Sequence, residues 1–247
     1  MSKKVAVLFD LETAGFHGGI CQIGSIDLNS DLNVLGDREH ITDPEREMGI
    51  DAIAVHGITE EMVKGQPTID KVVDEHLPTE GYLLAYNISF DSKMLRISNI
   101  EIPEGVKLFC VYELVQKLYP KHTLKHSQKN AAMFYGLGAY RDFEYEGALH
   151  TSLHDCRVTL ATLKVILKEN NLTLDEAYEL LYGKGAGFVA PEEIPVGDRE
   201  VHLRKYKGTG TTFKQLCEAD KPYVNWMLDK YDFKGDTELE KFLKENV

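Results

Sequence analysis

The spacing of apolar residues along the chain predicts strands that alternate with helices. The first apolar run, Val5–Phe9, is continuous, which is typical of a central strand covered on both faces. Two further strands are expected over residues 21–28 and 34–41, and the short turn between them requires an antiparallel pair. Residues 82–86 form another buried run. An opening three-stranded meander followed by alternating strands and helices predicts an α/β domain with a mixed sheet flanked by helices.

Amphipathic spacing predicts helices between and after these strands. In residues 68–77, four apolar side chains share one helical face: Ile69, Val72, Val73 and Leu77. Seven other segments are expected to be helical: residues 50–57, 59–63, 90–98, 111–118, 124–134, 152–169 and 173–182.

The chain is expected to divide into a large domain, a linker and a small module. Residues 1–182 contain all the predicted strands and form the large domain. Residues 183–199 are rich in glycine and proline and show no periodicity, as linkers do. Residues 200–247 contain two helix-like stretches, TTFKQLCEADKPYVNWML and DTELEKFLKEN, which predict a small helical C-terminal module.

Composition places the chain among ordinary globular proteins. Hydrophobic residues make up 43% and charged residues 28% of its 247 residues, so the chain can bury a sizeable core. No apolar stretch approaches the roughly 20 residues that span a bilayer, and we expect no association with a membrane. The start, MSKK, leaves no room for a signal peptide, and the four cysteines form no CxxC pair. The expected compartment is the cytoplasm, where thiols stay reduced.

The net charge of −12 argues against a protein whose main task is to coat nucleic acid. The charge is unevenly spread, because residues 199–247 hold 10 Lys and Arg against 9 Asp and Glu. Residues 1–198 therefore hold 18 against 31. The acidic excess belongs to the large domain.

Four acidic residues are the candidates for chemistry in that domain. Asp10 and Glu12 follow the first strand and project to the same side, where like charges repel unless a cation or water lies between them. Asp91 follows a strand-to-helix loop, and Asp155 opens a late helix. Each also has an ordinary structural interpretation: a solvated strand end, an acid in the first turn of a helix, or a capping box in which Ser152 is the cap.

Taken together, the four acids predict a divalent metal site. Their oxygen ligands suit Mg²⁺ or Mn²⁺ better than Zn²⁺. Two such ions can clamp a phosphodiester and activate water. His150 lies in the loop before the late helix, where an imidazole can act as a general base, and His154 inside that helix is the competing candidate.

Three motifs resemble those of the DEDDh (DnaQ-like) 3′–5′ exonucleases of the ribonuclease H-like superfamily. They are FDLETAG, which carries Asp10 and Glu12, AYNISFD, which carries Asp91, and HTSLHD, which carries His150 and Asp155. The resemblance implies a ribonuclease H-like fold and assigns the four acids as ligands of two Mg²⁺ ions, with Mn²⁺ as a substitute. It also implies that His150 is the general base.

The resemblance extends to the substrate pocket and to the C-terminal module. It implies that six residues bind the terminal nucleotide: Leu11, Thr13, His56, Ile58, Asn87 and Phe90. Residues 206–228 are similar to a small C-terminal module found in one branch of the family, although 203–205 (Leu-Arg-Lys) replace its usual Phe-Gly-Lys.

The expected function is therefore a metal-dependent 3′–5′ exodeoxyribonuclease that releases nucleoside 5′-monophosphates from DNA 3′ ends. Single-stranded ends should be accepted, because stacking does not read sequence. Leu11, Ile58 and Phe90 offer no partner to a 2′-hydroxyl, which favours DNA over RNA. The alternatives are a DEDDh ribonuclease that trims RNA 3′ ends, and an inactive nucleic-acid-binding adaptor.

Overall fold

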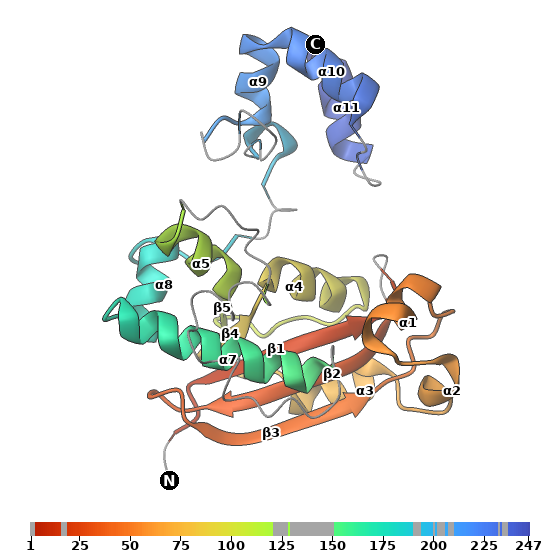
Figure 1. Cartoon of the computed structure of the whole chain (residues 1–247), viewed down its shortest axis with the longest axis vertical. Coiled ribbons are helices and arrows are strands. Elements are labelled where there is room, and N and C mark those ends of the chain that lie inside the picture. The colour runs from red at the N-terminus through yellow and green to blue at the C-terminus, as the bar shows by residue number, and fades with distance from the viewer. Residues whose placement is uncertain are drawn as a thin grey trace. The chain divides into compact units, whose positions relative to one another are not determined.

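The computed structural model describes residues 3–15, 19–120, 128, 151–189, 194–199, 201, 206, 210–231, 233 and 237–247. It contains a five-stranded mixed sheet with the strand order β3-β2-β1-β4-β5 (Figure 1). The strands are β1 (Ala6–Thr13), β2 (Ile20–Leu28), β3 (Val34–Ile41), β4 (Tyr82–Ala85) and β5 (Lys107–Cys110). β2 is antiparallel to both β1 and β3, whereas β1, β4 and β5 are parallel. The predicted meander and mixed sheet are confirmed.

Helices flank the sheet, as predicted. The α-helices of this part are α1 (Ile50–His56), α2 (Glu60–Val63), α3 (Ile69–Val72), α4 (Ile88–Ile97), α5 (Val111–Leu118), α7 (Ser152–Glu169) and α8 (Leu174–Tyr182). α5 and α7 have the predicted bounds. The helix predicted over residues 124–134 lies outside the described residues, except for Gln128, which is helical.

The helix predicted over residues 68–77 is shorter than expected. α3 ends at Val72, and a 3₁₀ turn, η1 (Val73–Glu75), follows it. Side chains of the sheet bind the end of this segment: Arg38 donates to the Glu75 carbonyl, and the buried His76 ring lies 2.8 Å from the Ser25 hydroxyl. These tertiary contacts replace the last helical turn.

Strand β1 is longer than the apolar run that predicted it. It continues to Thr13, because Asp10 and Glu12 stay in register with Gly24 and Gln22 of β2 before a bulge interrupts the pairing. The two acids therefore lie within the strand and not after it. Strand β5 was not predicted, because its four residues are too short to show a period.

Each face of β1 is covered by its own hydrophobic core. Ala6 and Leu8 pack with residues of α5, α7 and α8, whereas Val7, Phe9 and Leu11 pack with residues of α3 and α4. This two-sided burial confirms that β1 is a central strand. Since side chains alternate along a strand, Asp10 and Glu12 emerge on the face that α7 covers.

The chain forms two compact units, Met1–Phe188 and Val189–Val247. The second unit contains η3 (Val196–Asp198), α9 (Phe213–Ala219), α10 (Lys221–Lys230) and α11 (Thr237–Asn246). Val201, Leu216, Val224, Met227 and Leu243 are buried in its separate core. Over the described ranges, no helix combines the length and apolarity that a membrane crossing requires.

Candidate metal centre

Two strand residues and one helix residue bring three carboxylates together. Asp10 and Glu12 of β1 and Asp155 of α7 each offer one carboxylate oxygen, and these three oxygens lie within 4.8 Å of one another. Asp155 is separated from the two strand residues by more than 140 positions in the sequence. The structure thus unites three of the four acids that the sequence singled out.

The fourth acid, Asp91, is buried in the first turn of α4. Its negative charge contributes to the raised pKa of Asp10 and of Glu12, so it belongs to the same electrostatic site. Burial raises the pKa of Asp91 to about 7, and hydrogen bonds from its own backbone N–H and that of Leu11 act in the opposite direction.

Burial and mutual repulsion make this cluster strongly basic for a set of carboxylates. The pKa of Glu12 rises to about 8, first through burial and then through the charges of Asp155, Asp91 and Glu39. Burial, followed by the charges of Asp91, Asp155 and Glu12, raises the pKa of Asp10 well above its usual range. Without a cation, the cluster holds protons near neutral pH. A divalent cation can replace those protons, and an all-oxygen donor set fits Mg²⁺ or Mn²⁺.

The N-terminus of α7 differs from the predicted capping box. Thr151, in an extended conformation, is the N-cap, and its side chain accepts a hydrogen bond from the His154 backbone N–H. Ser152, the predicted cap, is instead the first helical residue, and its N–H donates to the side chain of Gln22. The capping-box interpretation of Asp155, with Ser152 as the cap, is therefore wrong, because Thr151 takes the cap position.

A glycine that the sequence analysis did not single out lets α7 approach the sheet. Gly24 pairs with Asp10 across β1 and β2, and a Cβ atom at this position would lie 2.5 Å from the Leu153 backbone nitrogen. On the other side of the turn, the buried Cys156 thiol lies 3.5 Å from the Gly24 carbonyl and 3.7 Å from that of Leu8. A glycine inside a strand is the signal that could have revealed this close approach.

The residues predicted to bind the terminal nucleotide lie in or beside three elements, β1, α1 and α4. Leu11, Thr13, His56 and Ile58 are buried, whereas Phe90 in α4 is half-buried and Asn87, just before α4, is exposed. The His56 ring contacts two of the others, Thr13 and Ile58.

His56 stands at the end of α1 and contacts the end of β1. Its Nδ1 accepts a hydrogen bond from the Ile58 N–H, and its Nε2 lies 3.3 Å from the Thr13 carbonyl. The neutral tautomer with hydrogen on Nε2 satisfies both contacts.

The two histidines predicted as base candidates have different outcomes. His150 lies outside the described residues, so its assignment stays a prediction. His154 is in the first turn of α7, partly exposed, and its backbone N–H is held by Thr151.

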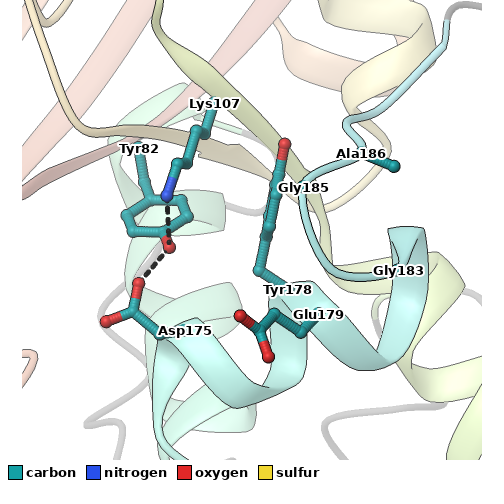
Figure 2. Close-up of a pocket in the computed structure, with 8 residues that line it drawn as sticks. All are labelled: Tyr82, Lys107, Asp175, Tyr178, Glu179, Gly183, Gly185 and Ala186. Carbon is teal, nitrogen blue, oxygen red and sulfur yellow. Dashed lines mark hydrogen bonds between the residues drawn. The ribbon is translucent and has the colours of Figure 1, made fainter.

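A separate cavity of about 470 Å³ lies where β4 and β5 begin, away from the strand ends that lead to Asp91. Figure 2 shows Lys107, Tyr82 and Asp175 joined in a row: Lys107 donates to the Tyr82 hydroxyl, which donates to Asp175 of α8. The Lys107 ammonium also lies 5.5 Å from the centre of the Tyr178 ring. These contacts tie α8 to the sheet.

Comparison with known proteins gives concordant matches. The family described as Exonuclease (RNase_T) matches residues 7–163. Exodeoxyribonuclease 10 of Escherichia coli (strain K12) is 28% identical over 225 residues, which cover 91% of each chain. A PolC-type DNA polymerase III of Clostridium perfringens (strain 13 / Type A) is 27% identical over 88% of this chain but only 15% of its own length.

Solved structures show the same relationship. A structure of exonuclease X in complex with 5′ overhanging duplex DNA superposes with a TM-score of 0.57 at 28% identity, covering 72% of this chain and 99% of that one. Escherichia coli exonuclease I in complex with a dT13 oligonucleotide has a TM-score of 0.55 at 17% identity and covers 68% of this chain and 42% of that one. This second similarity concerns the fold alone.

Proposed function

Because the chain belongs to the exonuclease family, we propose that it is a metal-dependent 3′–5′ exodeoxyribonuclease that releases nucleoside 5′-monophosphates. The observation that carries the proposal is the group of three carboxylate oxygens within 4.8 Å at the junction of β1 and α7. Such an oxygen set suits a divalent cation, because the cation relieves the mutual repulsion of the carboxylates. The alignment with exodeoxyribonuclease 10 over nearly all of both chains supports DNA as the substrate.

In this proposal the acids hold two Mg²⁺ ions, and Mn²⁺ can replace them. When bound, the ions would supply an activated water and stabilise the leaving oxygen. Asp10, Glu12, Asp91 and Asp155 are the proposed ligands. Bound cations would relieve the repulsion among these carboxylates and would hold the phosphodiester at the end of β1.

His150 is the proposed general base. It takes the proton from the water that attacks the terminal phosphodiester, and an imidazole, whose unperturbed pKa is about 6.5, suits this task. In the sequence it directly precedes Thr151, the cap of the helix whose first turn carries Asp155.

The proposed pocket for the 3′-terminal nucleotide contains Leu11, Thr13, His56, Ile58, Asn87 and Phe90. The apolar members can contact base and sugar, but they offer no hydrogen-bond partner to a 2′-hydroxyl. A buried 2′-hydroxyl without a partner would cost about 1–3 kcal/mol. We therefore propose that DNA is preferred to RNA by roughly tenfold to a hundredfold. Single-stranded 3′ ends should be cut readily.

The decisive experiment uses DNA and RNA oligonucleotides of the same sequence, each labelled at the 5′ or the 3′ end, with purified protein and Mg²⁺. We expect a ladder from the 5′ label, immediate release of a labelled mononucleotide from the 3′ label, and a higher kcat/KM for DNA. Asp155→Ala and EDTA are the controls for metal dependence. Equal or faster cleavage of RNA would indicate a ribonuclease, and binding without cleavage would indicate an adaptor.

We propose residues 1–182 as the catalytic domain, 183–199 as the linker and 200–247 as a module that engages the substrate. The basic share of the second part of the chain supports this assignment, since its 10 Lys and Arg contrast with the acidic large domain. The four cysteines are buried free thiols, which supports the cytoplasm as the compartment.

A further inference from the structure

The first turn of α7 determines where Asp155 stands relative to Asp10 and Glu12. The first N–H groups of any helix have no partner within the helix and must be satisfied from outside. In α7 Thr151 binds one of them, as described above. The N–H groups of Ser152 and Leu153 come directly before it, and their partners fix this turn against the rest of the domain.

Side chains of the sheet accept hydrogen bonds from the N–H groups of Ser152 and Leu153. The Ser152 N–H donates to Oε1 of Gln22 at 3.0 Å, and the Leu153 N–H donates to Oε1 of Glu39 at 2.9 Å. The Ser152 hydroxyl also donates to Glu39, at 3.4 Å. Glu39 thus accepts two hydrogen bonds from a helix N-terminus, where the helix dipole favours a negative charge.

The register of the sheet connects these two acceptors to the acids on β1. Gln22 of β2 is directly paired with Glu12, and Gly24 of β2 is paired with both Asp10 on one side and Glu39 on the other. Paired residues project to the same face of a sheet. The pairing of β1, β2 and β3 therefore fixes where Gln22 and Glu39, which hold α7, lie relative to Asp10 and Glu12.

We propose that Glu39 is a positioning residue for Asp155, supported by Gln22, and that it sets the spacing of the three carboxylates that receive the divalent ion. Glu39 does not contact the ion in this proposal; it acts through the backbone of the first turn of α7. The inference rests on the proposed metal-dependent function. The negative charge of Glu39 adds to the repulsion on Glu12, so its benefit must come from the hydrogen bonds that it accepts.

The test compares Glu39→Ala with Glu39→Gln in the full-length protein. Glutamine keeps an oxygen acceptor but removes the charge. For each variant, the Mg²⁺ concentration that gives half-maximal DNA hydrolysis is measured, and Mn²⁺ binding to the free protein is measured by calorimetry. We expect Glu39→Ala to raise the half-maximal Mg²⁺ concentration about tenfold and to lower the Mn²⁺ affinity about tenfold. This is the lower end of the effect of residues that orient metal ligands. The kcat at saturating Mg²⁺ should change far less.

Glu39→Gln should restore both values to within about threefold of the wild type. Asp37→Ala is the matched control, because Asp37 lies on the same strand and also contacts α7, through Arg157 at 2.8 Å, one turn beyond the Leu153 N–H that Glu39 binds. We expect the control to bind metal like the wild type. Melting temperatures in EDTA show whether a variant is simply less stable.

Two results would overturn the inference. If Glu39→Gln is as defective as Glu39→Ala, the charge matters and not the hydrogen bonds. If Glu39→Ala binds Mn²⁺ like the wild type, Glu39 has no positioning role. A wild-type protein that binds Mn²⁺ but does not cleave DNA contradicts the proposed function instead, and calorimetry still tests Glu39.

Discussion

The pKa values of the acidic residues at the end of β1 depend on the charges of the neighbouring acids. Burial and the charges of nearby acids raise the pKa of Glu12 to about 8, and burial raises that of Asp91 to about 7. A carboxyl group whose pKa is raised in the folded state binds more protons there than in the unfolded chain. The metal-free protein therefore loses stability as pH rises from the ordinary carboxyl range to about 8.

This reasoning predicts how the loss of one acid affects stability. In EDTA, Asp10→Ala or Asp155→Ala should melt at the same or a slightly higher temperature than the wild type at pH 8, because one repelling charge is gone. The fall in melting temperature between pH 6.5 and 8 should be smaller in these variants, and Mg²⁺ should suppress it in the wild type. Hydrolysis should be abolished. A large drop in melting temperature would show that the acids are structural partners and not ligands.

His150 calls for a different measurement, because it is a proposed base and not a ligand. His150→Ala should lower kcat by about 10²–10⁴, the usual contribution of a general base, while Mn²⁺ binding stays unchanged. The wild-type rate should rise with pH through the imidazole pKa, and the variant should lack this rise. His154→Ala is the control within α7. A larger defect in the control would reassign the base to His154.

At the scale of elements, the contact between α7 and β2 determines the geometry of the site. Gly24→Ala would place a methyl group 2.5 Å from the Leu153 nitrogen, in backbone that cannot move cheaply. We expect a loss of about 1–3 kcal/mol in the free energy of unfolding and a large loss of activity as Asp155 is displaced. Gly36→Ala on the neighbouring strand β3 is the control, because a Cβ there meets nothing within 4 Å. Denaturant unfolding and kcat/KM are measured for both variants. If Gly24→Ala and Gly36→Ala have the same stability and activity, the close approach of α7 to Gly24 does not determine the geometry of the site.

The elements also show what a sequence can and cannot predict. The bounds of α5 and α7 follow from apolar periodicity over several turns, and the meander follows from short turns between apolar runs. The extension of β1 to Thr13 and the cap at Thr151 depend instead on pairing with Gly24 and Gln22, more than 100 positions away from α7. Periodicity does not encode such contacts.

The candidate site shows the same division. Residue types and motif order identified Asp10, Glu12 and Asp155 as candidates for one site, and the structure places their oxygens together. Glu39 and Gln22 could not be identified in this way, because a lone acid on an exposed strand position looks like ordinary surface until the helix that it binds is placed.

At the scale of the whole molecule, two units have separate cores and different charge. The first unit ends at Phe188, which packs against the core of that unit. The second contains Tyr206, a residue that could stack on a base; its hydroxyl donates to Asp220 at 2.6 Å, and its ring meets Tyr223 edge to face. The ring is thereby held in one orientation, which suits a contact surface as well as a core position.

Removal of residues 189–247 tests what the second unit contributes. Because the acid cluster and both cores of the first unit lie before this boundary, kcat on short oligonucleotides should stay close to the wild-type value. The lost part includes all 10 Lys and Arg after residue 198, and phosphates that such cations neutralise release counterions. The truncated protein should therefore show a higher KM on long DNA and a weaker dependence of KM on salt. Unchanged kinetics on long DNA at every salt concentration would instead assign the second unit to stability or to a protein partner.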